Sequence, residues 1–141
     1  MNRQAAVAAC RMPEPFVKAL HTIRQAIAAT DLAIIAELDV SDRIKRQLGL
    51  GFAPCRILLV DSPYLLLEAV ALDRSAAALL PLHVVVSSHG SETMVHWLNP
   101  AAITGAALPA GTAGPLEKLR EQLAHALETV AIRDDQYQSV S

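Results

Sequence analysis

Two segments near the middle of the chain are rich in β-branched and apolar residues in strand-like order. They span residues 79–86 and 93–98, and the pair His89-Gly90 lies between them. Glycine tolerates the positive φ that a two-residue type I′ turn requires, so we place the turn at His89-Gly90. These patterns predict a β-hairpin at the centre of one sheet, with the helices of the chain packed on that sheet.

The predicted turn also sets which residues of the hairpin face each other. It places Val84 opposite Val95 and His83 opposite His96, and side chains then alternate between the two faces. Apolar side chains dominate one face, which we expect to lie in the core, whereas the second face is mixed. The core face carries Leu82, Val84, Val86, Thr93, Val95 and Trp97, and the second face carries His83, Val85, Ser87, Glu92, Met94 and His96.

His83 and His96 are candidate metal ligands on the second face. Directly opposed side chains have Cβ atoms roughly 4.5–5.5 Å apart, close enough for both imidazoles to bind one transition metal. Met94 would add a thioether, which suits a soft ion such as Cu(I). Zinc prefers about four ligands, and only these residues are in reach. The alternative is a polar outer face with two ordinary histidines, in which case the protein has no cofactor.

Helical periodicity precedes and follows the hairpin. Residues 15–29 form an amphipathic segment with one apolar stripe, and a second such segment begins at Gly114-Pro115. Short strands are expected at residues 4–11, 32–38 and 57–60. The two stripes consist of Phe16, Leu20, Ile23 and Ile27, and of Leu116, Leu119, Leu123, Leu127 and Val130.

Capping signals predict short helices on both sides of the third strand. Asp39 or Ser41 caps one helix, which ends at Leu48 before Gly49. Residues 61–63, Asp-Ser-Pro, begin the other. Helical turns are also expected at residues 75–80 and 99–105. The predicted fold class is therefore α+β, with an antiparallel sheet packed on long helices.

Glu37 and Asp39 are candidate catalytic or ligand-binding carboxylates. They lie two residues apart on a predicted strand, a separation of about 6.8 Å along its axis, which would suit paired-carboxylate chemistry. Lys45 is a further candidate for the same site. The alternative is that Asp39 caps the next helix while these carboxylates form surface ion pairs with Lys45 or Arg43. No third catalytic group is evident in the sequence.

Length and charge narrow the classes of function. The chain has 141 residues, which predicts one domain over residues 1–133 followed by a polar tail at 134–141. The formal net charge of −2 predicts no nucleic-acid partner. No apolar run reaches the roughly 18 residues of a membrane span, so we expect no membrane partner. Cys10 and Cys55 match no zinc or redox motif, which favours a reduced, cytoplasmic protein.

Several short motifs between about residues 16 and 130 are similar to those of a known family in order and spacing. They are Ile35-Ala36-Glu37-Leu38-Asp39-Val40, Ile44-Lys45, Leu48-Gly49, Phe52-Ala53-Pro54, Arg56-Ile57-Leu58, Ser62-Pro63, Leu79-Leu80-Pro81 and Val84-Val85-Val86. Together they resemble the domain of unknown function family 302. The resemblance implies a TATA-binding-protein-like fold, in the order strand, helix, four strands, helix. It also implies a small bacterial or archaeal protein that forms homodimers, and it supplies no activity.

The chain departs from the family pattern at two positions. Many members carry a cysteine directly after Leu-Leu-Pro, where this chain has Leu82, and many have a triplet such as Cys-Asn-Pro where it has Asp-Ser-Pro. The resemblance therefore gives no support for a thiol-based role here.

We predict a non-enzymatic binding or interaction domain that forms a homodimer. The mixture of Val85, Met94 and Ile35 with histidines and carboxylates on the second sheet face would form a subunit contact or a ligand surface. Two alternatives stay open, namely a metal-binding protein that uses His83 and His96, and an acid–base enzyme built around Glu37 and Asp39.

Overall fold

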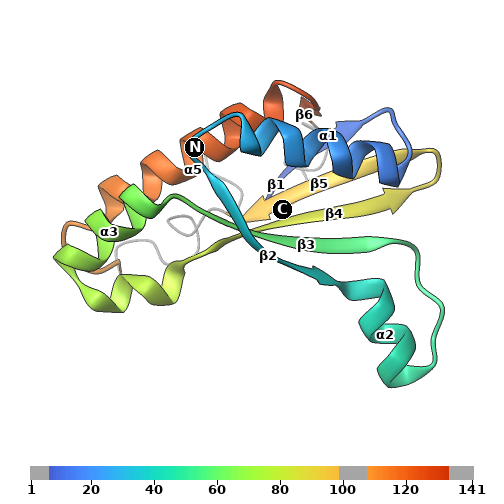
Figure 1. Cartoon of the computed structure of the whole chain (residues 1–141), viewed down its shortest axis with the longest axis horizontal. Helices are drawn as coiled ribbons and strands as arrows, with labels where there is room; N and C mark the ends of the chain where they lie inside the picture. The colour runs from blue at the N-terminus through green and yellow to red at the C-terminus, as the bar shows by residue number, and fades with distance from the viewer. Residues whose placement is uncertain (1–6, 99–107, 134–141) are drawn as a thin grey trace, which may run out of the picture.

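The structure is a computed structural model, which describes residues 7–98 and 108–133. Its described strands form one antiparallel sheet of six strands in the order β2-β3-β4-β5-β1-β6. The long helices α1 and α5 pack together against this sheet (Figure 1). The strands are β1 (Val7–Met12), β2 (Ala33–Asp39), β3 (Cys55–Asp61), β4 (Leu82–His89), β5 (Glu92–Leu98) and β6 (Ile132–Arg133), and the helices are α1 (Phe16–Ala28), α2 (Val40–Leu48), α3 (Pro63–Leu72), the 3₁₀ helix η1 (Arg74–Leu79) and α5 (Ala113–Glu128).

The hydrophobic core lies between the long helices and one face of the sheet. Most of the apolar stripe predicted for each helix is buried there, and the Trp97 side chain on β5 is only 3% exposed. The α+β class and the inward orientation of Trp97 are therefore confirmed. The core includes Leu20, Ile23 and Ile27 from α1, Leu119, Leu123 and Leu127 from α5, and Leu58, Val60, Val84, Val86 and Val95 from the strands.

The predicted register of the central hairpin is wrong by one residue on each strand. The turn consists of Gly90 and Ser91, and Val85 rather than His83 lies opposite His96. Gly90 has φ of +65°, whereas Ser91 does not have a positive φ, which fits a type II′ turn with glycine first. The two one-residue errors add up to a shift of two residues in the pairing. Because side chains alternate with a period of two, each one stays on its predicted face.

A bulge in β2 changes the face on which its second half lies. Ile34 pairs with Val60 and Ala36 pairs with Leu59, so Ile35 is an extra residue in the ladder. Glu37 then lies opposite the buried Leu58. The prediction that the carboxylates share the second sheet face with Ile35 is therefore wrong, because one inserted residue reverses the side chains that follow it.

The helix ends follow the capping signals in the sequence. The Asp39 side chain accepts a hydrogen bond from the backbone of Asp42 at the start of α2, and Gly49 ends that helix with φ of +68°. Ser62 caps α3, and η1 forms where a helical turn was predicted. The turn predicted at residues 99–105 and the tail at 134–141 lie outside the described residues.

The two edges of the sheet differ in length. The described part of the chain contains a sixth strand, β6, that the sequence did not predict; it has two residues and pairs with Cys10 and Arg11 of β1. The opposite edge is β2, with seven residues. One edge is therefore short and the other is long.

Candidate functional site

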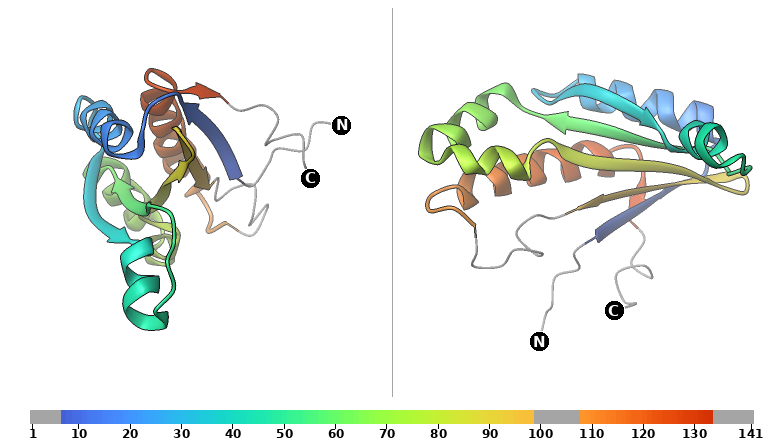
Figure 2. Two further views of the ribbon diagram at one scale, coloured as in Figure 1. Left: turned by 90° about the vertical axis from the view of Figure 1, so that its right-hand side faces the viewer. Right: turned by 90° about the horizontal axis from the view of Figure 1, so that it is seen from below.

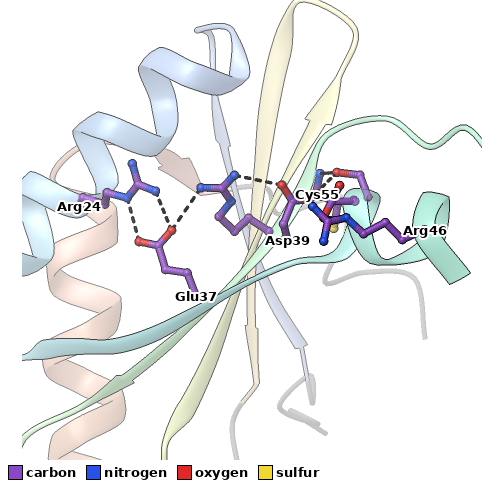
Figure 3. A network of polar contacts seen from close by, with 8 residues as sticks. Arg24, Glu37, Asp39, Arg46 and Cys55 are labelled. Atoms are coloured by element: carbon purple, nitrogen blue, oxygen red, sulfur yellow. Dashed lines mark hydrogen bonds and ion pairs between the residues drawn. The ribbon is translucent and has the colours of Figure 1, made fainter.

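The largest cluster of paired charged side chains in the described structure lies beside the long edge of the sheet. Glu37 and Asp39 on β2 point to the face that carries the helices, because the bulge at Ile35 has turned them there. Arg56 lies directly opposite Asp39 on β3, and Arg24 reaches the same place from α1. Figure 3 shows the resulting row, in which arginines alternate with carboxylates.

The four side chains form a continuous network. Arg24 donates two hydrogen bonds to Glu37, from Nε to Oε2 at 2.9 Å and from Nη2 to Oε1 at 2.6 Å. Arg56 donates from Nη1 to Glu37 Oε1 at 3.4 Å and from Nη2 to Asp39 Oδ2 at 3.1 Å. Two-pronged arginine–carboxylate contacts fix geometry as well as charge. The network therefore links α1, β2 and β3.

The second oxygen of Asp39 connects the network to α2. Asp39 Oδ1 accepts hydrogen bonds from the Asp42 backbone N–H at 2.9 Å and from the Ser41 hydroxyl at 2.8 Å. The Ser41 oxygen in turn accepts from the backbone N–H of Cys55 at 3.4 Å. Both Asp39 oxygens are thus engaged, and the start of α2 is tied to the start of β3.

The electrostatics do not suit an acid–base pair. The hydrogen bonds from Arg24 lower the pKa of Glu37, and the backbone N–H of Asp42 lowers the pKa of Asp39. Neither carboxyl therefore has the raised pKa that a general acid needs at neutral pH. A shallow hollow of about 350 Å³ does occur in the structure, but Ala29, Thr30, Asp31, Gln122 and His125 line it, and neither carboxylate does.

The predicted ion pairs of these carboxylates with Lys45 or Arg43 are wrong. Both basic residues are exposed on α2, and neither forms an ion pair within the residues the structure describes. Arg24 and Arg56 take their place. The capping role predicted for Asp39 is confirmed. In the sequence, the one sign that Arg24 points toward the sheet is its position beside the apolar stripe of α1.

The two histidines share the open face of the sheet, which α1 and α5 do not cover, but they are not directly opposed. His96 lies opposite Val85, and His83, two residues before Val85, is a diagonal neighbour. Diagonal residues are roughly 7–8 Å apart, farther than the predicted pairing required. Met94 is on the same face, next to Arg11 of β1. No group of three or more His, Cys, Asp or Glu residues in the described ranges is placed to hold a metal ion.

Neither cysteine has the surroundings of a reactive thiol. Cys10 is buried in the core, and Cys55 is half-buried at the start of β3. Burial, with a smaller effect from the nearby Asp39 carboxylate, raises the pKa of Cys55. A nucleophilic cysteine needs a lowered pKa and a positive environment, so neither residue fits that role.

A projecting segment, which we call the arm, consists of α2 and the following loop, residues 40–54. It extends from the end of β2, away from α1 and α5 (Figures 1 and 2). None of the α2 residues is buried. The exposed fractions are 67% for Leu48, 58% for Leu50 and 59% for Phe52. The sequence predicted the helix but did not indicate that Leu48, Leu50 and Phe52 would remain exposed.

Comparison with known proteins identifies the family. No curated protein matches this chain. The fold is similar to the crystal structure of the uncharacterized conserved protein DUF302 from Bacillus stearothermophilus, with a TM-score of 0.80 and 15% sequence identity over 89% of this chain and 98% of that one. No helix among the described residues is long and apolar enough to cross a membrane. The model of the family "Domain of unknown function DUF302" matches residues 8–130, and the chain belongs to that family.

Proposed function

We propose that this protein is a non-enzymatic interaction domain that works as a homodimer, and that the second copy docks on the edge strand β2. The proposal rests on the length of this edge strand and on the exposure of its apolar residues. In the described structure β2 is hydrogen-bonded to β3 alone, and it has seven residues. Ile35 and Leu38 on this strand are 54% and 41% exposed. A long apolar edge strand is a ready template for pairing with another chain.

The contrast with the other edge supports the proposal. Natural sheets protect their edges with very short strands or with charged residues. In the described residues the strand β6 has both features, because it consists of Ile132 and Arg133. The bulge at Ile35 protects one point of β2, but residues 36–39 run in regular register with β3. The long edge therefore keeps a regular row of backbone groups.

A second copy is the partner that this edge fits best. Two identical strands pair antiparallel about a two-fold axis, so one surface suffices for both sides of the contact. The carboxylates of β2 are held on the helix-covered face by Arg24 and Arg56, which leaves Ala36 and Leu38 on the open side. No charged β2 side chain on that side would then oppose its copy across the two-fold axis.

The test is the mass of the protein in solution. We expect sedimentation velocity and light scattering to give a dimer for the wild type and a monomer for the double variant Ile35→Lys, Leu38→Lys. Val17→Lys is the matched control, because Val17 is an apolar residue 79% exposed on α1; it should remain dimeric. All variants should keep the wild-type circular dichroism spectrum. A wild type that stays monomeric at high concentration, or a double variant that stays dimeric, contradicts the proposal.

A further inference from the structure

We infer that the arm, residues 40–54, binds the surface of an anionic lipid bilayer. This goes beyond the proposed dimer and uses a different surface. In α2, Val40, Ile44 and Leu48 recur every four residues on one side, where Val40 and Ile44 are half-buried and Leu48 is exposed. The other side is polar and basic. A strongly amphipathic helix of low overall hydrophobicity with a basic polar face is the pattern of a segment that lies in a membrane interface.

The charge of the arm is opposite to that of the rest of the chain. The arm has three basic residues, Arg43, Lys45 and Arg46, and one acidic residue, Asp42, which gives it a net charge of +2. The whole chain has −2, so the remaining residues together carry −4. Arg46 pairs with Asp42 at 2.9 Å, whereas the structure gives Arg43 and Lys45 no ion pair in its described part. A negatively charged surface would therefore attract the arm and repel the rest.

The apolar side chains of the arm gather near the end of α2 and in the loop that follows. Leu48 is the last helical residue, and Leu50 and Phe52 follow the left-handed Gly49. All three are more than half exposed. A protein groove that binds a helix requires anchors on one helical face. Anchors divided between a helix and an irregular loop fit better into the soft boundary between lipid head groups and acyl chains.

The position of the arm makes such contact possible. It projects from the end of β2, away from the long helices (Figure 2). The sequence predicted no membrane partner because no apolar run is long enough to span a bilayer, but a segment that lies in the membrane interface needs no such run. Basic residues close to an anionic bilayer each add to the binding, and Leu and Phe add the apolar contribution.

The test is sedimentation of the full chain with lipid vesicles. We expect binding to vesicles that contain about 30% phosphatidylserine in phosphatidylcholine, no binding to pure phosphatidylcholine, and release by about 0.5 M salt. The variant Arg43→Gln, Lys45→Gln should weaken binding on the order of tenfold or more. The variant Leu50→Ser, Phe52→Ser should also weaken it on the order of tenfold or more.

A matched control removes two positive charges elsewhere. Lys18 and Lys118 have side chains that are 72% and 62% exposed, and Lys18→Gln, Lys118→Gln should bind vesicles like the wild type. The edge-strand variant Ile35→Lys, Leu38→Lys should still bind, which separates this inference from the proposed dimer. Wild-type protein that ignores anionic vesicles, or arm variants that bind as well as the wild type, would overturn it. Arm variants that are monomeric, together with a wild type that does not bind vesicles, would also overturn it. The arm would then be a contact between two copies of the protein.

Discussion

The ion pair between Arg24 and Glu37 joins helix α1 to the edge strand, and its strength can be measured with a double-mutant cycle. The cycle consists of Arg24→Ala, Glu37→Ala and the double variant, each compared with the wild type. Arg24 and Glu37 share two hydrogen bonds of 2.9 and 2.6 Å, so the geometry is favourable. We expect a coupling free energy of about 0.5–1 kcal/mol that stabilises the folded protein.

The size of this coupling follows from exposure. The Arg24 side chain is 40% exposed and that of Glu37 is 27% exposed, so water screens the pair and keeps it in the range of surface ion pairs. The pair Asp42–Arg46 provides a control within the same protein. Its N–O distance is also 2.9 Å, but its side chains are 47% and 77% exposed, and we expect a coupling of only about 0.3 kcal/mol.

The assay is urea unfolding at neutral pH and low salt, followed by circular dichroism, with both cycles measured in the same buffer. High salt should reduce both coupling energies. A coupling between Arg24 and Glu37 no larger than that between Asp42 and Arg46 would show that two-pronged geometry and lower exposure do not strengthen this ion pair. A changed m-value in either single variant would indicate instead that the fold itself had altered.

Three further results are expected from unfolding measurements. The free energy of unfolding of the wild type should fall as the pH drops below the ordinary glutamate pKa of 4.5, because Arg24 keeps the pKa of Glu37 lower in the folded protein than in the unfolded chain. Glu37→Gln should make the free energy of unfolding less dependent on pH between about pH 5 and pH 3. An unchanged pH dependence in this variant would refute the prediction. Gly90→Ala should cost about 1–2 kcal/mol because φ is +65°, whereas Gly51→Ala, where φ is not positive, should be nearly neutral; equal effects would count against the turn. Leu123→Ala should cost about 2–5 kcal/mol, since this side chain is fully buried, and a loss below 1 kcal/mol would contradict that position.

Periodicity in the sequence was sufficient to predict the long helices, the central hairpin and the face on which each hairpin side chain lies. The inward face of the hairpin was assigned correctly although the turn was misplaced, because moving both strands by one residue preserves alternation. The choice between His89-Gly90 and Gly90-Ser91 depends on whether glycine comes first or second in the turn. Both are acceptable two-residue loops, so local sequence could not decide between them.

The candidate site was harder to predict because it depends on one extra residue. Nothing in the run from Ala33 to Asp39 marks Ile35 as a bulge, yet the bulge moves both carboxylates to the opposite face. Their partners, Arg24 and Arg56, are 13 to 19 residues from Glu37 in sequence. Local spacing favoured the nearer cations of α2 and could not show these longer-range contacts.

Because the two edge strands of the sheet differ in length, the number of copies that could join through strand pairing is limited. If β2 is the docking strand, each molecule contributes it once, and the partner's copy occupies it fully. Within the described residues, the strand β6 at the other end has only two residues, too little backbone to start a further row. Assembly through the strands of the described residues would therefore stop at a closed pair.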